Sequence, residues 1–405
     1  MTRWLSIVGI GEDGLSGLGE QARHLIDQAE VLIGGERHLS MLPEDGRERL
    51  TWPSPLSRLV AEIEARRGQS VCVVATGDPF CFGIGTTLAR RIPMMEMQVV
   101  PAPSAFSLAC AQLGWSLPEV SLLTLHGRPT SLLIPALQPD ARLMVLSDSR
   151  RTPAEVASLL CEKGFGASEL HVLEHLGGPR QRVLHLRADQ EDFPEFADFN
   201  TIAVVCRAGT ETEILPRVPG LPDTAFHHDG QLTKREVRAV TLSALMPGPD
   251  QVLWDVGAGS GSVAVEWMRT TPTTRAVAIE RQAARCEMIA SNAARLGVPY
   301  LKLVPGEAPS CLSDLPAPDA IFIGGGINGE GLFEACWQAL KPGGRLVANA
   351  VTLEGEARLA GLQAEYGGEL RRLSVSRSES VGPFRGWRPA MPVTQFALVK
   401  PRGEA

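Results

Sequence analysis

Short apolar runs alternate with helical patterns along the whole chain of 405 residues. The first half carries such runs at 5–9, 31–33, 70–75, 98–100, 142–146 and 201–205. Helical patterns lie between several of them, for example at 87–91 and 153–160. Because apolar runs of this length are typical of buried strands, the alternation predicts an α/β sheet.

The second half starts again with its own alternation, which is more regular than the first. A helix is expected from Thr233 and another from about Ser262. Strands are expected at 251–255, 275–280, 301–304, 320–323 and 345–350, and further helices at 282–296 and up to Leu340. This is the pattern of a doubly wound sheet, which binds its ligand at the carboxyl ends of the strands.

Between the halves, residues 209–228 show little periodicity and contain Pro216, Pro219 and Pro222. Proline-rich segments without periodicity are typical of linkers, and a chain of this length is long for one core. We therefore predict a first domain at 1–208, a linker at 209–228 and a second domain at 229–405.

The composition is that of an ordinary globular protein, with 44% hydrophobic and 21% charged residues. No apolar stretch is long enough to cross a bilayer, and the first residues do not form a signal peptide, so we expect a cytoplasmic protein. The eight cysteines are scattered without a Cys-x-x-Cys pair, which favours reduced thiols and no metal site. A net charge of −7 argues against a nucleic-acid partner.

The clearest chemical motif is the loop Gly257-Ala258-Gly259-Ser260-Gly261, which follows the strand ending in Asp255. Glycines permit positive φ and let a ligand approach the backbone closely. A dinucleotide site would place its third glycine where this chain has Ser262, so the spacing favours S-adenosylmethionine (SAM). Glu280 ends the next strand, where a carboxylate can accept both ribose hydroxyls. The alternatives are a tight turn without ligand and a solvated strand end.

The segment Leu340-Lys341-Pro342-Gly343-Gly344 resembles a turn of the seven-stranded Rossmann-like methyltransferases. In that fold the position of Gly306, Glu307 and Ala308, after a strand, meets the adenine. Thr233 to Glu236 have the spacing of a capping box, and Thr233 is included among the expected cofactor residues.

Two loops of the first half, Thr76-Gly77-Asp78-Pro79-Phe80-Cys81 and Pro101-Ala102-Pro103-Ser104-Ala105, each follow an apolar run. In this order they resemble the tetrapyrrole methylase family, whose members hold SAM in a cleft between two α/β lobes. The resemblance implies Gly77, Asp78, Cys81, Ser104 and Ala105 as cofactor contacts, with Ser147 as a weaker candidate. The first loop reads Gly11-Glu12-Asp13-Gly14 instead of the Pro-Gly-Asp-Pro of many members, which leaves its role open.

The segments 125–128, 174–178, 232–238 and 376–389 together resemble the bifunctional, decarboxylating methyltransferases of cobalamin biosynthesis. That resemblance implies methylation of a precorrin-6 macrocycle at carbons 5 and 15 and loss of carbon dioxide from an acetate side chain, giving precorrin-8. It assigns carbon 5 to the first domain, and carbon 15 with the decarboxylation to the second. It also implies two SAM sites and a homo-oligomer, a tetramer formed through the C-terminal domain.

A substrate edged with carboxylates needs cationic partners, and Arg377, Arg385 and Arg388 lie near Trp387, which offers a flat surface. The alternative is a solvated basic tail. His126 and Arg128 follow an expected strand and are the only catalytic candidates, although a structural role suits His126 as well. No strong base is required, and no metal or further cofactor is expected.

Three other functions compete with this one. They are an RNA-modifying SAM methyltransferase, a non-catalytic SAM-binding regulator and an NAD-dependent oxidoreductase. The acidic balance opposes the first, the intact glycine loop with Glu280 opposes the second, and Ser262 opposes the third.

Overall fold

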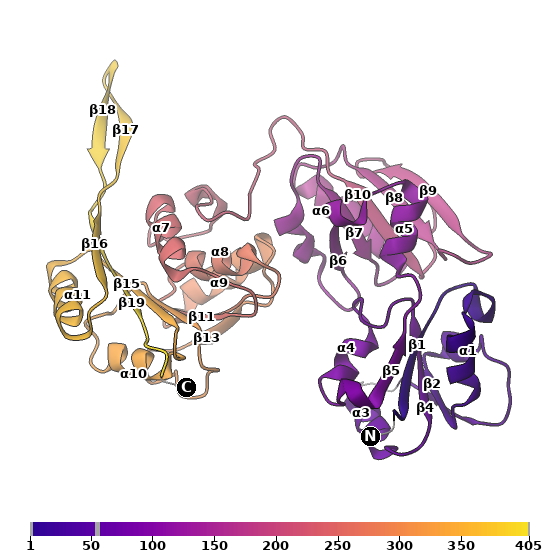
Figure 1. Ribbon diagram of the computed structural model, residues 1–405. Coiled ribbons are helices and arrows are strands. Elements are labelled where there is room, and N and C mark those ends of the chain that lie inside the picture. Colours follow the sequence, from indigo (N-terminus) through magenta and orange to yellow (C-terminus); the bar gives the residue numbers. More distant parts are fainter. Residues whose placement is uncertain (1–2, 53–56, 404–405) are drawn as a thin grey trace. The chain divides into compact units, whose positions relative to one another are not determined.

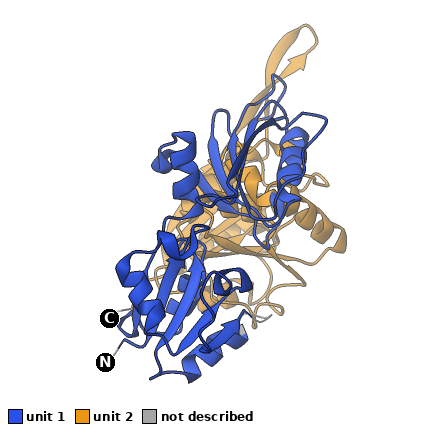
Figure 2. Cartoon of the chain, turned by 90° about the vertical axis from the view of Figure 1, so that its right-hand side faces the viewer, with its two compact units in different colours: residues 1–130, 138–213 blue, residues 131–137, 214–405 orange. Residues whose placement is uncertain are grey.

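The computed structural model describes residues 3–52 and 57–403, and the chain divides into two compact units. Unit 1 comprises residues 1–130 and 138–213, and unit 2 comprises residues 131–137 and 214–405 (Figure 2). Both units are α/β, which confirms the predicted fold class.

The first lobe of unit 1 is a parallel sheet of order β3-β2-β4-β1-β5 (Figure 1). Its strands are β1 Leu5–Ile10, β2 Val31–Gly34, β3 Glu48–Thr51, β4 Val71–Thr76 and β5 Met97–Val100. Its helices are α1 Glu20–Asp27, α2 Glu36–Leu39, α3 Ser57–Ala65 and α4 Ile84–Ala89. Ile7 and Val73 belong to one apolar cluster, and their neighbours Val8 and Val74 belong to another. Strands buried on both faces explain the continuous apolar runs of the sequence.

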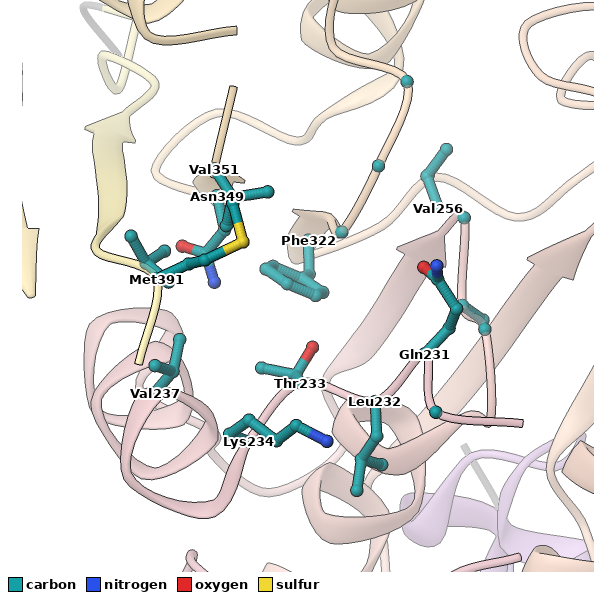
Figure 3. Close-up of a pocket in the computed structure, with 18 of the residues that line it drawn as sticks. Gln231, Leu232, Thr233, Lys234, Val237, Val256, Phe322, Asn349, Val351 and Met391 are labelled. Carbon is teal, nitrogen blue, oxygen red and sulfur yellow. The ribbon is translucent and has the colours of Figure 1, made fainter. Parts of the chain in front are cut away.

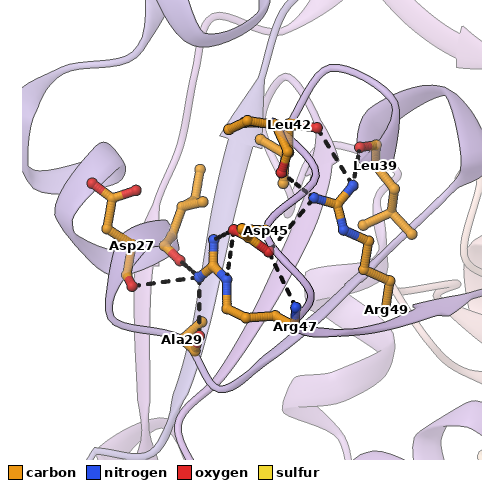
Figure 4. Close-up of polar contacts among 9 residues, drawn as sticks. Asp27, Ala29, Leu39, Leu42, Asp45, Arg47 and Arg49 are labelled. Carbon is orange, nitrogen blue, oxygen red and sulfur yellow. Dashed lines mark hydrogen bonds and ion pairs between the residues drawn. The ribbon is translucent and has the colours of Figure 1, made fainter.

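Two arginines tie the loop before β3 to neighbouring backbone (Figure 4). Arg47 donates to Asp45 at 2.8 Å and to the carbonyl of Ala29 at 3.0 Å, just beyond the end of α1. Arg49 donates to the carbonyls of Leu39 and Leu42 at 3.0 and 3.4 Å. Carbonyls at helix ends lack intrahelical partners, so these side chains hold a stretch that has little apolar burial of its own.

The second lobe is a sheet of order β6-β7-β10-β8-β9, in which only β6 and β7 run parallel. Its strands are β6 Ser121–Thr124, β7 Arg142–Leu146, β8 Glu169–Glu174, β9 Arg182–Arg187 and β10 Asn200–Val205. Its helices are α5 Ala105–Leu113 and α6 Thr152–Glu162. Two lobes within one unit are the arrangement that the family resemblance implies.

Unit 2 is built on one seven-stranded sheet of order β13-β12-β11-β14-β15-β19-β16, with β19 antiparallel to both neighbours. Its strands are β11 Val252–Val256, β12 Arg275–Glu280, β13 Lys302–Pro305, β14 Ala320–Ile323, β15 Arg345–Ala350, β16 Glu369–Leu373 and β19 Val393–Val399. Its helices are α7 Arg235–Leu245, α8 Ser262–Thr270, α9 Ala283–Arg295, α10 Leu332–Ala339 and α11 Leu353–Tyr366. Strands β17 Ser376–Val381 and β18 Phe384–Pro389 form a hairpin that projects from this sheet (Figure 1).

Part of the segment expected as a linker is packed into unit 2. Leu221, Ala225 and Phe226 are buried in its core. Ala225 is the last residue of the short 3-10 helix η5 Asp223–Ala225, and the other two residues flank this helix. The backbone amides of Gly220 and Leu221 donate to Glu266, which is also paired with buried Arg238 at 2.6 Å. This segment is held by hydrogen bonds to an ion pair and not by a helix or strand of its own. Such contacts produce no hydrophobic periodicity, and the sequence of the segment therefore resembles that of a linker.

The capping box expected at Thr233 does not form, and this correction moves the start of the helix. Helix α7 begins at Arg235, with Lys234 in the N-cap position and no side-chain cap. The carbonyl of Thr233 accepts from Arg238 at 2.5 Å, and Glu236 pairs with Arg377 at 2.7 Å. Glu236, which the spacing predicts to cap the helix, thus forms a long-range ion pair with Arg377 instead.

Candidate active sites

The C-terminal cavity lies at the carboxyl ends of β11, β12 and β14 and has a volume of about 860 Å³. Gly257, Ala258 and Gly259 form part of its wall. Gly257, Gly259 and Gly261 have φ of 68°, 59° and 75°, so each occupies the left-handed region that glycine adopts without strain. A Cβ at Gly257 would lie 3.2 Å from the Gly325 carbonyl oxygen, so a side chain there would press against that backbone.

Glu280 is 4% exposed and lines this cavity with Gly306, Glu307 and Ala308, as expected. Its Oε2 accepts from the amide of Gly259 at 2.9 Å, and its Oε1 accepts from the amide of Gln282 at 2.9 Å. Each carboxylate oxygen has a second lone pair, so both can still accept from a diol. The glutamate therefore joins the glycine loop to the following strand and faces the ligand space.

Asp255 lies at the end of β11 and is fully buried behind the loop. Its Oδ2 accepts from the amide of Ala264 in the first turn of α8 at 3.0 Å, and its Oδ1 has no partner among the described residues. Burial raises the pKa of Asp255 to about 7, with a smaller contribution from Glu280. Asp255 therefore anchors the helix that follows the loop and does not act as an exposed anion. Ser260 is also buried and, with Gly261, does not line the cavity.

The other end of this cavity is formed by residues that the sequence analysis did not single out, apart from Thr233. Figure 3 shows Phe322, Asn349 and Met391 around the same cavity as Thr233 and Lys234. Asn349 donates to Thr241 at 3.0 Å and accepts from Gln395 at 3.1 Å, which fixes its amide. The one available sequence signal was the triplet Gly324 to Gly326, which follows a strand and also lines the cavity.

The four substrate candidates of the tail separate in the structure. Arg377 and Arg388 line the cavity, whereas Arg385 and Trp387 do not, and Trp387 is 78% exposed. The reason is the alternation of side chains along the hairpin: Arg377 and Arg388 pair across it and share one face, whereas Arg385 and Trp387, which pair with Ser380 and Ser378, lie on the opposite face. Arg377 is held by Glu236, and Arg388 by Glu379 at 3.0 Å.

The N-terminal cavity has a volume of about 760 Å³. Its lining includes the residues that the family resemblance implies for this domain, namely Gly77, Asp78, Cys81, Ser104, Ala105 and the weaker candidate Ser147. Gly77 has φ of 55°, and a Cβ there would lie 2.9 Å from the Pro103 carbonyl oxygen. Asp78 accepts from the amide of Phe80 at 2.8 Å, and Ser104 caps α5 by accepting from Ser107 at 3.1 Å. Side-chain caps and one glycine thus shape these two loops.

The two catalytic candidates are placed differently. His126 lines the N-terminal cavity and lies 3.3 Å from Asp148, but its side chain is 79% exposed. Arg128 is exposed and is not part of the lining. Both residues were chosen because they follow an expected strand, but only His126 lines the cavity, and Arg128 lies on the surface.

The polar wall of this cavity includes residues that were not expected as site residues, among them Glu12, His38 and His175. Glu12 accepts from His175 at 2.8 Å and also pairs with Arg37. Burial and the charge of Arg37 lower the pKa of His38 to about 4. In the sequence, Glu12 lies in the unusual first loop and His175 in the segment 174–178 that carries the resemblance, whereas no pattern indicated His38.

The described residues contain no cluster of three or more His, Cys, Asp or Glu side chains placed to hold a metal ion. The same part of the chain has no helix that combines the length and apolarity needed to cross a membrane. All eight cysteines are free thiols.

Residues 5–190 match the family of Tetrapyrrole (Corrin/Porphyrin) Methylases, and residues 224–400 match the family described as Precorrin methyltransferase domain. Over 398 residues the chain is 49% identical to the Precorrin-6Y C(5,15)-methyltransferase (decarboxylating) of Sinorhizobium sp, across 98% of this chain and 96% of that protein. The chain belongs to this family. It is a methyltransferase, and the family implies SAM as the methyl donor.

Two shorter relatives each carry one activity in their names. The Cobalt-precorrin-7 C(5)-methyltransferase of Salmonella typhimurium is 32% identical over 50% of this chain and 97% of its own length. The Probable cobalt-precorrin-6B C(15)-methyltransferase (decarboxylating) of Saccharolobus solfataricus is 35% identical over 34% of this chain and 72% of its own length. Gly77 and Gly257 present bare backbone at the walls of the two cavities, because an added Cβ would lie 2.9 Å and 3.2 Å from a carbonyl oxygen. Loops of this kind fit a ligand that approaches the backbone closely, such as SAM.

Proposed function

We propose that this methyltransferase methylates a precorrin-6 macrocycle at carbons 5 and 15 and decarboxylates an acetate side chain, giving precorrin-8. The observation that carries the proposal is the pair of cavities, each with a glycine loop at the carboxyl ends of parallel strands. A single methylation needs one such cavity. Two cavities in one chain suit two methylations, and each is proposed to bind one SAM.

The division of labour follows the two family matches. The N-terminal cavity is proposed to methylate carbon 5, and the C-terminal cavity to methylate carbon 15 and to carry out the decarboxylation. The relatives that each carry one of these activities support this division.

Bound SAM supplies an electrophilic methyl group on a sulfonium sulfur. The chain's own residues then have to hold the accepting carbon in line with that methyl group and exclude water. In the C-terminal cavity the glycine loop and Glu280 are proposed to hold the cofactor. Phe322, Asn349 and Met391 would border the macrocycle, with Arg377 and Arg388 near its carboxylates.

The assembly is proposed to be a homo-oligomer, a tetramer formed through unit 2, in the cytoplasm. The hairpin supports an assembly through this unit, because Val381, Phe384 and Trp387 are 62%, 76% and 78% exposed in the single chain. Apolar side chains gathered on a projecting hairpin are typical of protein contact surfaces. Light scattering of the purified chain measures the mass directly, and a monomer at micromolar concentration would contradict this part.

The deciding experiment incubates the purified chain with SAM and the reduced precorrin-6 substrate and follows the product by mass spectrometry. We expect a gain of two methyl groups and the loss of one carbon dioxide. Unchanged substrate, in a preparation for which calorimetry shows SAM binding, would rule out the proposed function. Salt-sensitive binding of RNA by that preparation would instead favour the RNA-modifying alternative.

A further inference from the structure

A histidine and a glutamate from the two lobes of unit 1 meet at the wall of the N-terminal cavity. Glu12 follows β1 in the first lobe, and His175 follows β8 in the second. Nδ1 of His175 lies 2.8 Å from Oε2 of Glu12, and both residues line the cavity. A carboxylate on one ring nitrogen orients the imidazole and determines which nitrogen faces the ligand.

The charge state of Glu12 settles the tautomer of that ring. Its side chain is only 6% exposed, and burial raises the pKa of Glu12. The hydrogen bond with His175 and the charge of Arg37 outweigh burial and hold that pKa below its usual value. An ionised carboxylate only accepts, so Nδ1 must carry the proton and the neutral ring presents Nε2 as an acceptor. The described residues offer Nε2 no hydrogen-bond partner.

The other two histidines of this cavity do not combine these properties. Nε2 of His38 already contacts Thr76 at 2.9 Å and Arg37 at 2.8 Å. His126 is mostly exposed, and its contact with Asp148 is 3.3 Å. His175 is therefore the one described histidine of the cavity that is both oriented by a buried carboxylate and open at its other nitrogen.

We infer that His175 accepts the proton that the macrocycle loses when the N-terminal site methylates it, with Glu12 as the positioning residue that orients the ring. This inference rests on the proposed function. The sulfur keeps the electron pair of the broken S–CH₃ bond, and the macrocycle supplies the pair for the new C–C bond. The macrocycle gains one positive charge in this step, and transfer of one proton to Nε2 removes that charge again. Base catalysis of this kind contributes roughly 100-fold to 10,000-fold.

Charged groups of both lobes lie near His175 and influence its charge. Glu12 and Arg37 belong to the first lobe, while Arg180 and Glu174 flank His175 along the chain. Asp78 and Asp198 line the same cavity. Since a proton on Nε2 removes the acceptor, acidification should slow the N-terminal methylation.

The backbone at His175 allows an unusually direct test. Its φ is 47°, a conformation that glycine adopts without strain. His175→Gly therefore removes the ring without stressing the turn and leaves space for free imidazole. In the full chain we expect the N-terminal methylation to fall at least about 100-fold, and added imidazole to restore part of it. Carbon dioxide loss and the other methylation continue, which the product masses report separately.

Two further variants complete the test. Glu12→Gln keeps the shape but loses the charge, and should shift the pH profile of the N-terminal methylation while SAM affinity, measured by calorimetry, is unchanged. His24→Gln changes an exposed histidine on α1 as the matched control and should alter neither. If the wild-type chain produces no doubly methylated product, the proposed function fails. If it does, but His175→Gly keeps its rate or is not rescued by imidazole, or Glu12→Gln keeps the wild-type profile, the inference is wrong.

Discussion

The two cavities differ in how their glycine loops are held and in the charge of the nearest buried carboxyl group. In unit 2, three glycines at positive φ shape the loop, and Asp255 behind it is buried without a cation, so that its pKa rises to about 7. In unit 1, Glu12 is also buried, but His175 and Arg37 lower its pKa. The difference teaches that burial without a cation raises the pKa of a carboxyl group, whereas a charged partner keeps the group ionised and available to orient another side chain.

The largest expected effect comes from filling the two loops in turn. Gly257→Val and Gly77→Val each place a branched side chain at positive φ and against a carbonyl oxygen, at 3.2 Å and 2.9 Å from the new Cβ. Each should lower the rate of one of the two methylations at least about 100-fold, because strain and collision together cost several kcal/mol. Calorimetry should then show one SAM per chain instead of two.

Gly367→Val is the control for strain without collision, since Gly367 has φ of 76° and no atom within 4 Å of its added Cβ. It should keep both activities. If Gly257→Val and Gly77→Val remove the same methylation, the division of labour between the cavities is wrong.

The next effect concerns the stability of unit 2. Between its ordinary pKa of 3.8 and about 7, Asp255 keeps a proton in the folded chain that the unfolded chain has released. The free energy of unfolding therefore falls as the pH rises through this window, and does not change further above it. Asp255→Asn should remove this slope, a relative gain on the order of 4 kcal/mol from pH 4 to pH 8.

Urea unfolding followed by tryptophan fluorescence at several pH values measures this difference, with exposed Asp314→Asn as the control. Glu12 has the opposite sign: its lowered pKa contributes stability above the ordinary carboxyl pKa that is lost as the pH falls. Equal slopes for wild type and Asp255→Asn would show that Asp255 is ionised in the fold.

A smaller effect is expected from Glu280→Gln. The amide removes the negative charge and one of the two acceptor oxygens that face the C-terminal cavity. We expect SAM affinity at this site to fall about tenfold, or roughly 1.4 kcal/mol, and the N-terminal site to be unaffected. Exposed Glu287→Gln on α9 is the matched control. Loss of affinity at both sites would contradict the independence of the two cavities.

The smallest effect separates the arginines of the hairpin. Arg377 is paired with Glu236 at the cavity, whereas Arg385 does not line it, so Arg377→Ala should raise the KM for the macrocycle a few-fold. An exposed ion pair contributes at most about 1 kcal/mol, which limits the change to roughly fivefold. Arg385→Ala should leave this KM within about twofold in steady-state assays. The reverse order would place the substrate on the outer part of the hairpin.

Local sequence determined the strands and the glycine loops, because each depends on residues close together in the chain. Apolar runs such as 71–75 are buried on both faces of a sheet, and Gly257, Gly259 and Gly261 occupy a backbone region that other residues rarely adopt. From these, the fold class, both loops and the position of Glu280 could be predicted, whereas the cofactor residues expected in the first half are implied by the family resemblance.

Only the tertiary structure decided which distant side chains meet. It pairs Glu12 with His175 across two lobes, takes Glu236 from the expected cap to Arg377, and packs Leu221 into the core of unit 2. It also brings Arg377 and Arg388 to a cavity and leaves Trp387 outside it. Such contacts join residues far apart in the chain, and their energy depends on burial and geometry that no spacing along the sequence records.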